Sequence, residues 1–141
     1  MILPDVNVLV EGFRAEREHH QVCHRLLSAA VASDQAYGIS ELALSAFVRI
    51  VTNPRIFDRP STLDEALDFA AALTRSANSV RIAPGPRHWD IFTRVCRESH
   101  VKGDMVTDAY FAALAIEHGC EWITLDGDFA RFADLKWRRP A

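Results

Sequence analysis

The sequence predicts an α/β protein in which helices cover both faces of a mostly parallel sheet. Short apolar segments alternate with segments of helical apolar spacing along the whole chain, which is the pattern of strand–helix–strand units. The chain has 141 residues, 49% of them hydrophobic and 25% charged, which suits one domain with a substantial core. Because no linker, repeat or low-complexity tract interrupts the alternation, we expect a single domain over residues 1–141.

The first half of the chain is expected to contain two strands. One is the apolar opening run, which ends at Asp5, and the other covers residues 36–39. Ser40 is a suitable N-cap for the helix that follows, and Asn53-Pro54 should stop that helix. Two overlapping capping boxes, Ser61 with Asp64 and Thr62 with Glu65, introduce a later helix. The helices predicted from apolar spacing in this half cover residues 6–13, 21–32, 41–52 and 63–77.

The second half continues the same alternation. The helix predicted over 107–118 is apolar almost all round and should be deeply buried, with Thr107 as N-cap and Gly119 just beyond its end. The preceding helix, 88–100, is amphipathic, and the residues expected to face inward are Trp89, Phe92, Val95 and Cys96. Strands are predicted over 80–83, 121–125 and 135–137, with a helical turn over 129–132.

Charge and cysteine content exclude several classes of protein. The net charge is −3 and the pI about 6.0, so the chain lacks a global basic signature for nucleic acid, although a local basic rim is compatible with these values. Cys23, Cys96 and Cys120 are odd in number and form no CxxC pair, which favours reduced, mostly buried thiols. No apolar run approaches the ~20 residues needed to span a bilayer. We therefore expect a soluble, cytoplasmic protein.

Four acidic residues occupy equivalent positions in the predicted fold. Asp5 ends the first strand, Glu41 opens a helix after the second, Asp108 lies at the start of the buried helix, and Asp126 follows the fourth strand. Each alone is compatible with helix-start or turn chemistry. In a parallel sheet, however, strand ends and the helix starts after them lie at one edge. Carboxylates gathered there would repel one another unless cations bind, and hard oxygen ligands suit Mg²⁺ or Mn²⁺.

The segments that carry these acids resemble the motifs of PIN-domain ribonucleases, and in particular the VapC-type toxins of prokaryotic toxin–antitoxin pairs. The matching segments are Asp-Val-Asn-Val-Leu at 5–9, Ser-Glu-Leu at 40–42, Thr-Asp-Ala-Tyr-Phe-Ala-Ala-Leu-Ala at 107–115 and Thr-Leu-Asp-Gly-Asp-Phe at 124–129. The resemblance covers nearly the whole chain and includes residues 53–55 and 84–89. It implies a PIN-like three-layer α/β/α sandwich with a mostly parallel sheet of four or five strands.

The same resemblance implies a Mg²⁺- or Mn²⁺-dependent endoribonuclease toxin that cleaves tRNA or rRNA and inhibits translation. Such proteins are usually homodimers neutralised by a cognate, VapB-like antitoxin. By position, the four acids described above, Asp5, Glu41, Asp108 and Asp126, would be the metal ligands and catalytic residues. Asn7 and Thr124 would orient carboxylates or waters, and Asp128 would be an alternative or supporting partner. Asp104 departs from the commoner pattern. It could add negative charge at the rim of the site or cap the loop in which it lies, and we expect the capping role.

RNA would need cations around an acidic pocket. Several other functions remain open: a catalytically silent PIN-fold binding module, a structure-specific DNA nuclease, and a receiver-like module, of whose acid pattern only Asp5 is present. His19, His20 and His24 are expected on a solvated face. An antitoxin helix is expected on an apolar groove over residues 42–57. The candidate RNA-binding residues are Arg14, Arg17, Arg49, Arg55, Arg59, Arg87, Arg131, Arg138 and Arg139.

Overall fold

The computed structural model describes all 141 residues and contains five short strands. Every strand pairing is parallel, and the pairs form two hydrogen-bonded sheets, β1-β4-β5 and β2-β3. The shared direction of the strands places all their carboxyl ends at one edge, as the sequence analysis predicts. The strands are β1 (Ile2–Pro4), β2 (Tyr37–Ile39), β3 (Ser79–Arg81), β4 (Glu121–Ile123) and β5 (Trp137–Arg138).

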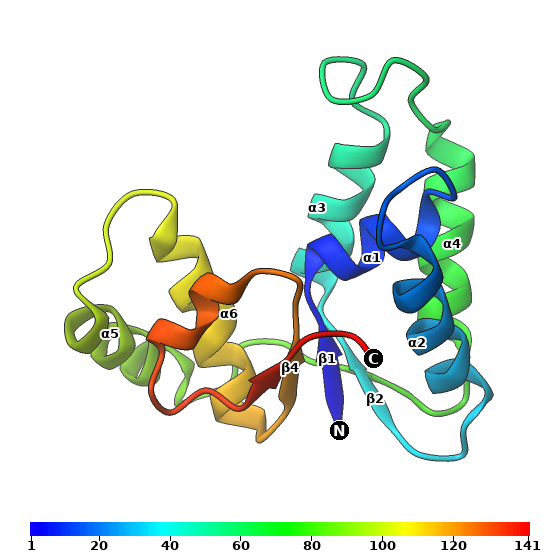
Figure 1. Ribbon diagram of the computed structural model, residues 1–141. Coiled ribbons are helices and arrows are strands. Elements are labelled where there is room, and N and C mark those ends of the chain that lie inside the picture. Colours follow the sequence, from blue (N-terminus) through cyan, green and yellow to red (C-terminus); the bar gives the residue numbers. More distant parts are fainter.

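The two sheets meet where β1 and β2 lie side by side (Figure 1). Gly38 of β2 packs so closely here that a Cβ atom would lie 2.8 Å from the Ile82 side chain and 3.3 Å from the Ile2 carbonyl oxygen. The five strands thus follow one another in the order β3-β2-β1-β4-β5, with the ladder interrupted between β2 and β1. The parallel arrangement is confirmed, and the interruption is a feature that the sequence did not predict.

Helices cover the strands on both sides in three layers (Figure 1). The first four helices lie on one side and α5 and α6 on the other, which is the α/β/α sandwich expected. No helix of the chain is long and apolar enough to cross a membrane. The helices are α1 (Val6–Phe13), α2 (His20–Ala32), α3 (Glu41–Val51), α4 (Leu63–Arg75), α5 (His88–Ser99), α6 (Met105–His118) and the 3₁₀ turn η1 (Gly127–Arg131).

Helix ends follow local capping chemistry in most places. The Ser40 hydroxyl accepts from the Ala43 amide at 3.3 Å. Thr62 and Glu65 form the full capping box at the start of α4. Gly119 ends α6 with a φ of 64°, in the left-handed region where glycine is least strained. These three predictions are confirmed.

The start of α6 is earlier than predicted. The helix begins at Met105, so Thr107 lies within its first turn and does not cap it. The entry is a backbone turn: Gly103 has a φ of 63°, and its carbonyl accepts from the Val106 amide at 3.0 Å. The N-cap residue is Asp104, but its side chain makes no capping hydrogen bond, so the backbone turn defines this end of the helix.

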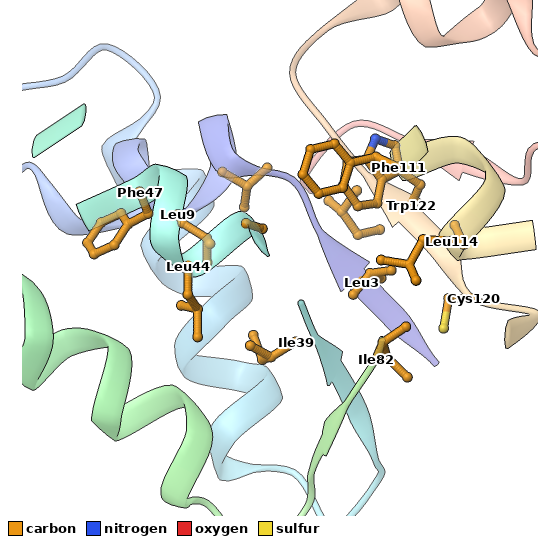
Figure 2. Close-up of a cluster of buried hydrophobic side chains, with 14 of the residues drawn as sticks. Leu3, Leu9, Ile39, Leu44, Phe47, Ile82, Phe111, Leu114, Cys120 and Trp122 are labelled. Carbon is orange, nitrogen blue, oxygen red and sulfur yellow. The ribbon is translucent and has the colours of Figure 1, made fainter. Parts of the chain in front are cut away.

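The core is one cluster of buried hydrophobic side chains between the layers (Figure 2). The predicted burial of α6 is confirmed, and its Phe111 ring stacks on Trp122 of β4 with centroids 5.3 Å apart. The inward placement of Trp89 on α5 is wrong, because this side chain is 65% exposed. His88 is buried instead, and its Nε2 lies 3.1 Å from the Tyr110 carbonyl oxygen, which satisfies its polar ring.

The three cysteines are free. Cys23 and Cys120 are buried and Cys96 is half-buried. Burial raises the pKa of the Cys23 thiol to about 11, with the negative charge of Glu11 adding to the shift. Such thiols are poor nucleophiles at neutral pH and act as small core side chains.

Candidate metal centre

Asp5 lies where β1 turns into α1. Its amide donates to the Ile123 carbonyl oxygen at 2.8 Å and continues the pairing of β1 with β4 by one residue. Its carboxylate caps α1, because Oδ1 accepts from the Val6 amide at 2.6 Å. The residue is only 7% exposed. The strand end and the helix start together hold one buried carboxylate at the carboxyl edge of the sheet.

Thr124 and Asn7 fix the second oxygen of that carboxylate. The fully buried Thr124 hydroxyl donates to Asp5 Oδ2 at 2.6 Å, and Asn7 Nδ2 donates to the same oxygen at 3.2 Å. Asn7 Oδ1 in turn accepts from the Leu125 amide at 3.1 Å, which ties α1 to the segment after β4. Both side chains therefore contact Asp5 in the way expected of orienting residues.

The pKa of Asp5 is raised to about 6. Burial is the largest cause, since it disfavours the charged form. The hydrogen bonds from Thr124 and Val6 act in the opposite direction, and the nearby negative charges of Asp108 and Asp126 raise the pKa further. Because the charges of Asp108 and Asp126 affect the pKa of Asp5, three of the four predicted acids share one electrostatic environment.

Asp108 projects from the first turn of α6 and is half-buried. Its pKa is raised, first by burial and then by the charge of Asp126, while Arg131 lowers it. Asp128 and Asp104 add smaller raising effects, so both lie in the same acidic surroundings. Asp126 is held in place by its own turn: its amide donates to Thr124 Oγ1 at 3.0 Å, and its Oδ1 accepts from the Asp128 amide at 2.9 Å.

Glu41 is not brought to this group. Its side chain is 70% exposed, and its nearest cation is Arg81 Nη1 of β3, 3.8 Å from Glu41 Oε2. Glu41 is the first residue of α3, and the first buried residues of this helix are Ala43 and Leu44. The placement of Glu41 among the ligands therefore has no support in the structure, although the start of α3 is where the sequence predicts it.

A pocket of about 670 Å³ opens in front of these carboxylates. Its acidic residues from the predicted set are Asp5, Asp108 and Asp126. The pocket also contains Glu11, which sequence reasoning missed; its side chain is 8% exposed and its Oε2 lies 2.8 Å from Arg17 Nε. The spacing of the residues could have indicated Glu11, because it follows Asn7 by four residues and so lies on the same face of α1.

Only some of the arginines and histidines considered in the sequence analysis lie at the pocket. Arg17 and Arg49 line the pocket, whereas the other proposed arginines do not. His19 and His24 are exposed, as expected for a solvated face. The His20 ring contacts a backbone carbonyl oxygen, that of Glu11, at 2.9 Å.

Comparison with known proteins identifies the family. The family model of the PIN domain matches residues 2–135 of the chain. The chain belongs to the PIN-domain family. Ribonuclease VapC25 of Mycobacterium tuberculosis is 36% identical over 140 residues, covering 99% of each chain. Ribonuclease VapC43 of the same organism is also 36% identical, with 99% of this chain and 95% of the relative covered. These relatives confirm the VapC-type resemblance seen in the sequence motifs.

Solved structures show the same PIN fold at low sequence identity. VapBC2 of Rickettsia felis, bound to a promoter DNA fragment, matches with a TM-score of 0.72 and 13% identity, covering 100% of each chain. VapC20 of Mycobacterium tuberculosis, described as a sarcin–ricin loop cleaving toxin, matches with a TM-score of 0.64 and 16% identity over 96% of this chain and 99% of that chain. At these identities, the likeness establishes the fold.

Nucleases of the PIN-domain VapC group are generally metal-dependent. In this PIN domain, no three His, Cys, Asp or Glu side chains lie close enough together to form a complete metal cage. The donors that line the pocket are nevertheless carboxylates, the ligand type that hard divalent cations prefer. Mg²⁺ usually keeps several waters and takes only one or two protein carboxylates. The residues present fit a hydrated Mg²⁺ or Mn²⁺, and they do not fit a closed structural site.

Proposed function

We propose that this chain is a metal-dependent endoribonuclease of the VapC type, acting as a toxin until a cognate antitoxin neutralises it. The observation that carries the proposal is the buried Asp5, whose pKa is raised to about 6 beside Asp108 and Asp126. It is supported by 36% identity over 140 residues to proteins named ribonuclease VapC. The proposed target is RNA, with tRNA or rRNA as the classes to test, which would place the action in the cytoplasm and make inhibited translation its result.

The three carboxylates Asp5, Asp108 and Asp126 would hold Mg²⁺, with Mn²⁺ as a substitute. The bound ion supplies a water of lowered pKa and offsets charge on the phosphate oxygens. Asp5 lines the pocket and is kept in one orientation by Thr124 and Asn7. Asp128 would support Asp126 through the turn that joins them.

The reaction is an in-line hydrolysis of one RNA phosphodiester. The water oxygen forms a bond to phosphorus while the bond to the leaving ribose oxygen breaks, and the water proton passes to a pocket carboxylate. Asp108 is proposed for that role because its carboxylate lines the pocket together with Asp5 and Asp126. The leaving oxygen takes its proton from solvent.

The antitoxin is proposed to cover the apolar groove over residues 42–57. Leu42 is 49% exposed and Ile56 is 51% exposed, so this segment offers unburied apolar surface.

A homodimer is also proposed, as is a single domain over residues 1–141. The single domain is supported by one hydrophobic cluster that contains residues from Leu3 to Leu135.

A catalytically silent PIN-fold binding module is the second candidate. It is favoured by one observation, the lack of three close metal-ligating side chains. Such a module would bind Mg²⁺ or RNA without cleaving it. A structure-specific DNA nuclease would be recognised by cleavage of 2′-deoxy substrates alongside, or instead of, ribose substrates.

The test is sequencing of RNA ends after brief expression of the wild type, Asp5→Asn and Asp108→Asn, without antitoxin. Glu41→Gln is the matched control, because it also removes one carboxylate charge but from an exposed position. We expect new RNA ends with the wild type and the control and none with the two aspartate variants. Equal cleavage by all four proteins would refute the mechanism, and no cleavage by the wild type across tRNA and rRNA would favour the silent module.

A further inference from the structure

The pocket has a second wall, formed by α3, that differs in charge from the first. Ala46, Arg49 and Ile50 of α3 line it, at the spacing of three and four residues that defines one helix face. None of these residues is acidic. The carboxylates of the pocket come instead from the end of β1, from α1 and the segment after it, from α6 and from the segment after β4. The α3 side of the pocket therefore carries a single charge, the guanidinium of Arg49.

Arg49 differs from Arg17, the other arginine that lines the pocket, in having no acidic partner. Arg17 is held by the nearly buried Glu11, with Arg17 Nε 2.8 Å from Glu11 Oε2. No Asp or Glu lies within ion-pair distance of Arg49. The neighbouring Ala46 is small and leaves space in front of α3. A free guanidinium in a pocket of about 670 Å³ can therefore reach a ligand without first breaking an ion pair.

We propose that Arg49 binds a phosphate group of the RNA and holds the phosphodiester against the carboxylate wall. The inference rests on the proposed ribonuclease function and adds to it the residue that recognises the substrate charge. Acidic side chains alone repel a phosphodiester, so a site of this kind needs a cation on the protein side. A planar guanidinium pairs with two phosphate oxygens at once, which fixes orientation as well as charge. α3 thus supplies the phosphate-binding group, and the carboxylates of the pocket would supply the metal ligands.

The experiment compares Arg49→Ala and Arg49→Lys with Arg97→Ala as the matched control. Arg97 lies on α5, outside the pocket, and is exposed without an ion pair. Cleavage of one short RNA in Mg²⁺ should fall roughly tenfold to a hundredfold in kcat/KM for Arg49→Ala, the loss expected for a charged hydrogen bond. Arg49→Lys should recover part of it, since it keeps charge without the bidentate geometry. Arg97→Ala should stay within about twofold of the wild type, as expected for a surface substitution.

Two further measurements separate phosphate binding from other roles. Mn²⁺ affinity, measured by calorimetry, should be equal in wild type and Arg49→Ala, because Arg49 is not a metal ligand. RNA affinity, measured by fluorescence anisotropy, should fall when Arg49→Ala is added to Asp108→Asn, and the salt slope should decrease by about one phosphate contact. The comparison of Asp108→Asn with and without Arg49→Ala measures RNA binding even if the wild type does not cleave RNA. A failure of the proposed ribonuclease function can therefore be distinguished from a failure of the Arg49 assignment. Unchanged RNA affinity, unchanged kcat/KM or lost Mn²⁺ binding would each overturn the assignment of Arg49.

Discussion

Replacing Thr124 with valine should weaken both the fold and the site. The Thr124 hydroxyl is completely buried; it donates to Asp5 Oδ2 at 2.6 Å and accepts from the Asp126 amide at 3.0 Å. Valine has nearly the same shape without the hydroxyl, so one Asp5 carboxylate oxygen, the half-buried Asp126 amide and the Asn7 side-chain amide each lose a partner. With 1.5–3 kcal/mol for the charged bond and about 1 kcal/mol for the amide, the free energy of unfolding should fall by about 3 kcal/mol.

The size of this loss should depend on pH. The Thr124 hydrogen bond lowers the pKa of Asp5, which is about 6, so its removal raises that pKa further. Because the bond favours ionised Asp5, Thr124→Val should destabilise the protein more at pH 8 than at pH 5. At pH 7 a smaller fraction of Asp5 is ionised in the variant, so its RNA-cleavage profile should move to higher pH.

Urea unfolding followed by circular dichroism at pH 5 and pH 8 measures the first effect, and cleavage rates between pH 5 and 9 measure the second. Thr124→Ser is the control, because it keeps the hydroxyl and loses only a buried methyl group, at about 1 kcal/mol. The serine variant should keep the wild-type pH profile. The reasoning is refuted if the valine and serine variants share one pH profile, or if the valine variant loses equal stability at both pH values.

Three further substitutions test separate parts of the structure. The pKa of Asp5 is raised from 3.8 to about 6, so its contribution to stability is present below pH ~4 and is lost as the pH rises through 6. In EDTA at pH 8, Asp5→Asn should therefore unfold in urea with about 1–3 kcal/mol more stability than the wild type, and equal stabilities would contradict this. Gly38→Ala places a methyl group 2.8 Å from the Ile82 side chain, and the melting temperature should drop by the equivalent of about 1–3 kcal/mol. An unchanged melting temperature would show that the Ile82 side chain moves aside without cost. Thr62→Ala removes the capping box of α4 and should lower the free energy of unfolding in urea by about 1 kcal/mol. An unchanged free energy of unfolding would show that the capping box does not stabilise α4.

The parts of the fold that could be predicted are those with a local chemical signal. Ser40 and Thr62 are hydroxyl side chains placed directly before helical spacing, and both cap as expected. Asp5 was informative because a carboxylate directly after a buried strand must meet hydrogen bonds or a cation. Its partner Thr124 is 119 residues away in the chain, and only the parallel pairing of β1 with β4 brings the two together.

The errors arise where the signal depends on packing. Trp89 is large and apolar, but the buried residues of α5 are His88 and Val95, seven residues apart and so on one helix face. The sequence alone does not show that a histidine is buried with its ring hydrogen-bonded. Glu41 shares a helix-start position with Asp108, but its exposed side chain lies near Arg81 of β3 and does not line the pocket. The rotation of a helix about its own axis is fixed by contacts between elements, and a single sequence does not show these contacts.

Asp5, Asp108 and Asp126 are proposed to form the working site, and Glu41 is proposed to lie outside it. The direct test is the Mg²⁺-dependent cleavage rate of one RNA by purified Asp108→Asn and Glu41→Gln beside the wild type. We expect Asp108→Asn to lose at least about a hundredfold in rate, as is typical for a catalytic acid or base, and Glu41→Gln to remain within about threefold of the wild type. A Glu41→Gln protein as inactive as Asp108→Asn, or an Asp108→Asn protein as active as the wild type, would contradict the account.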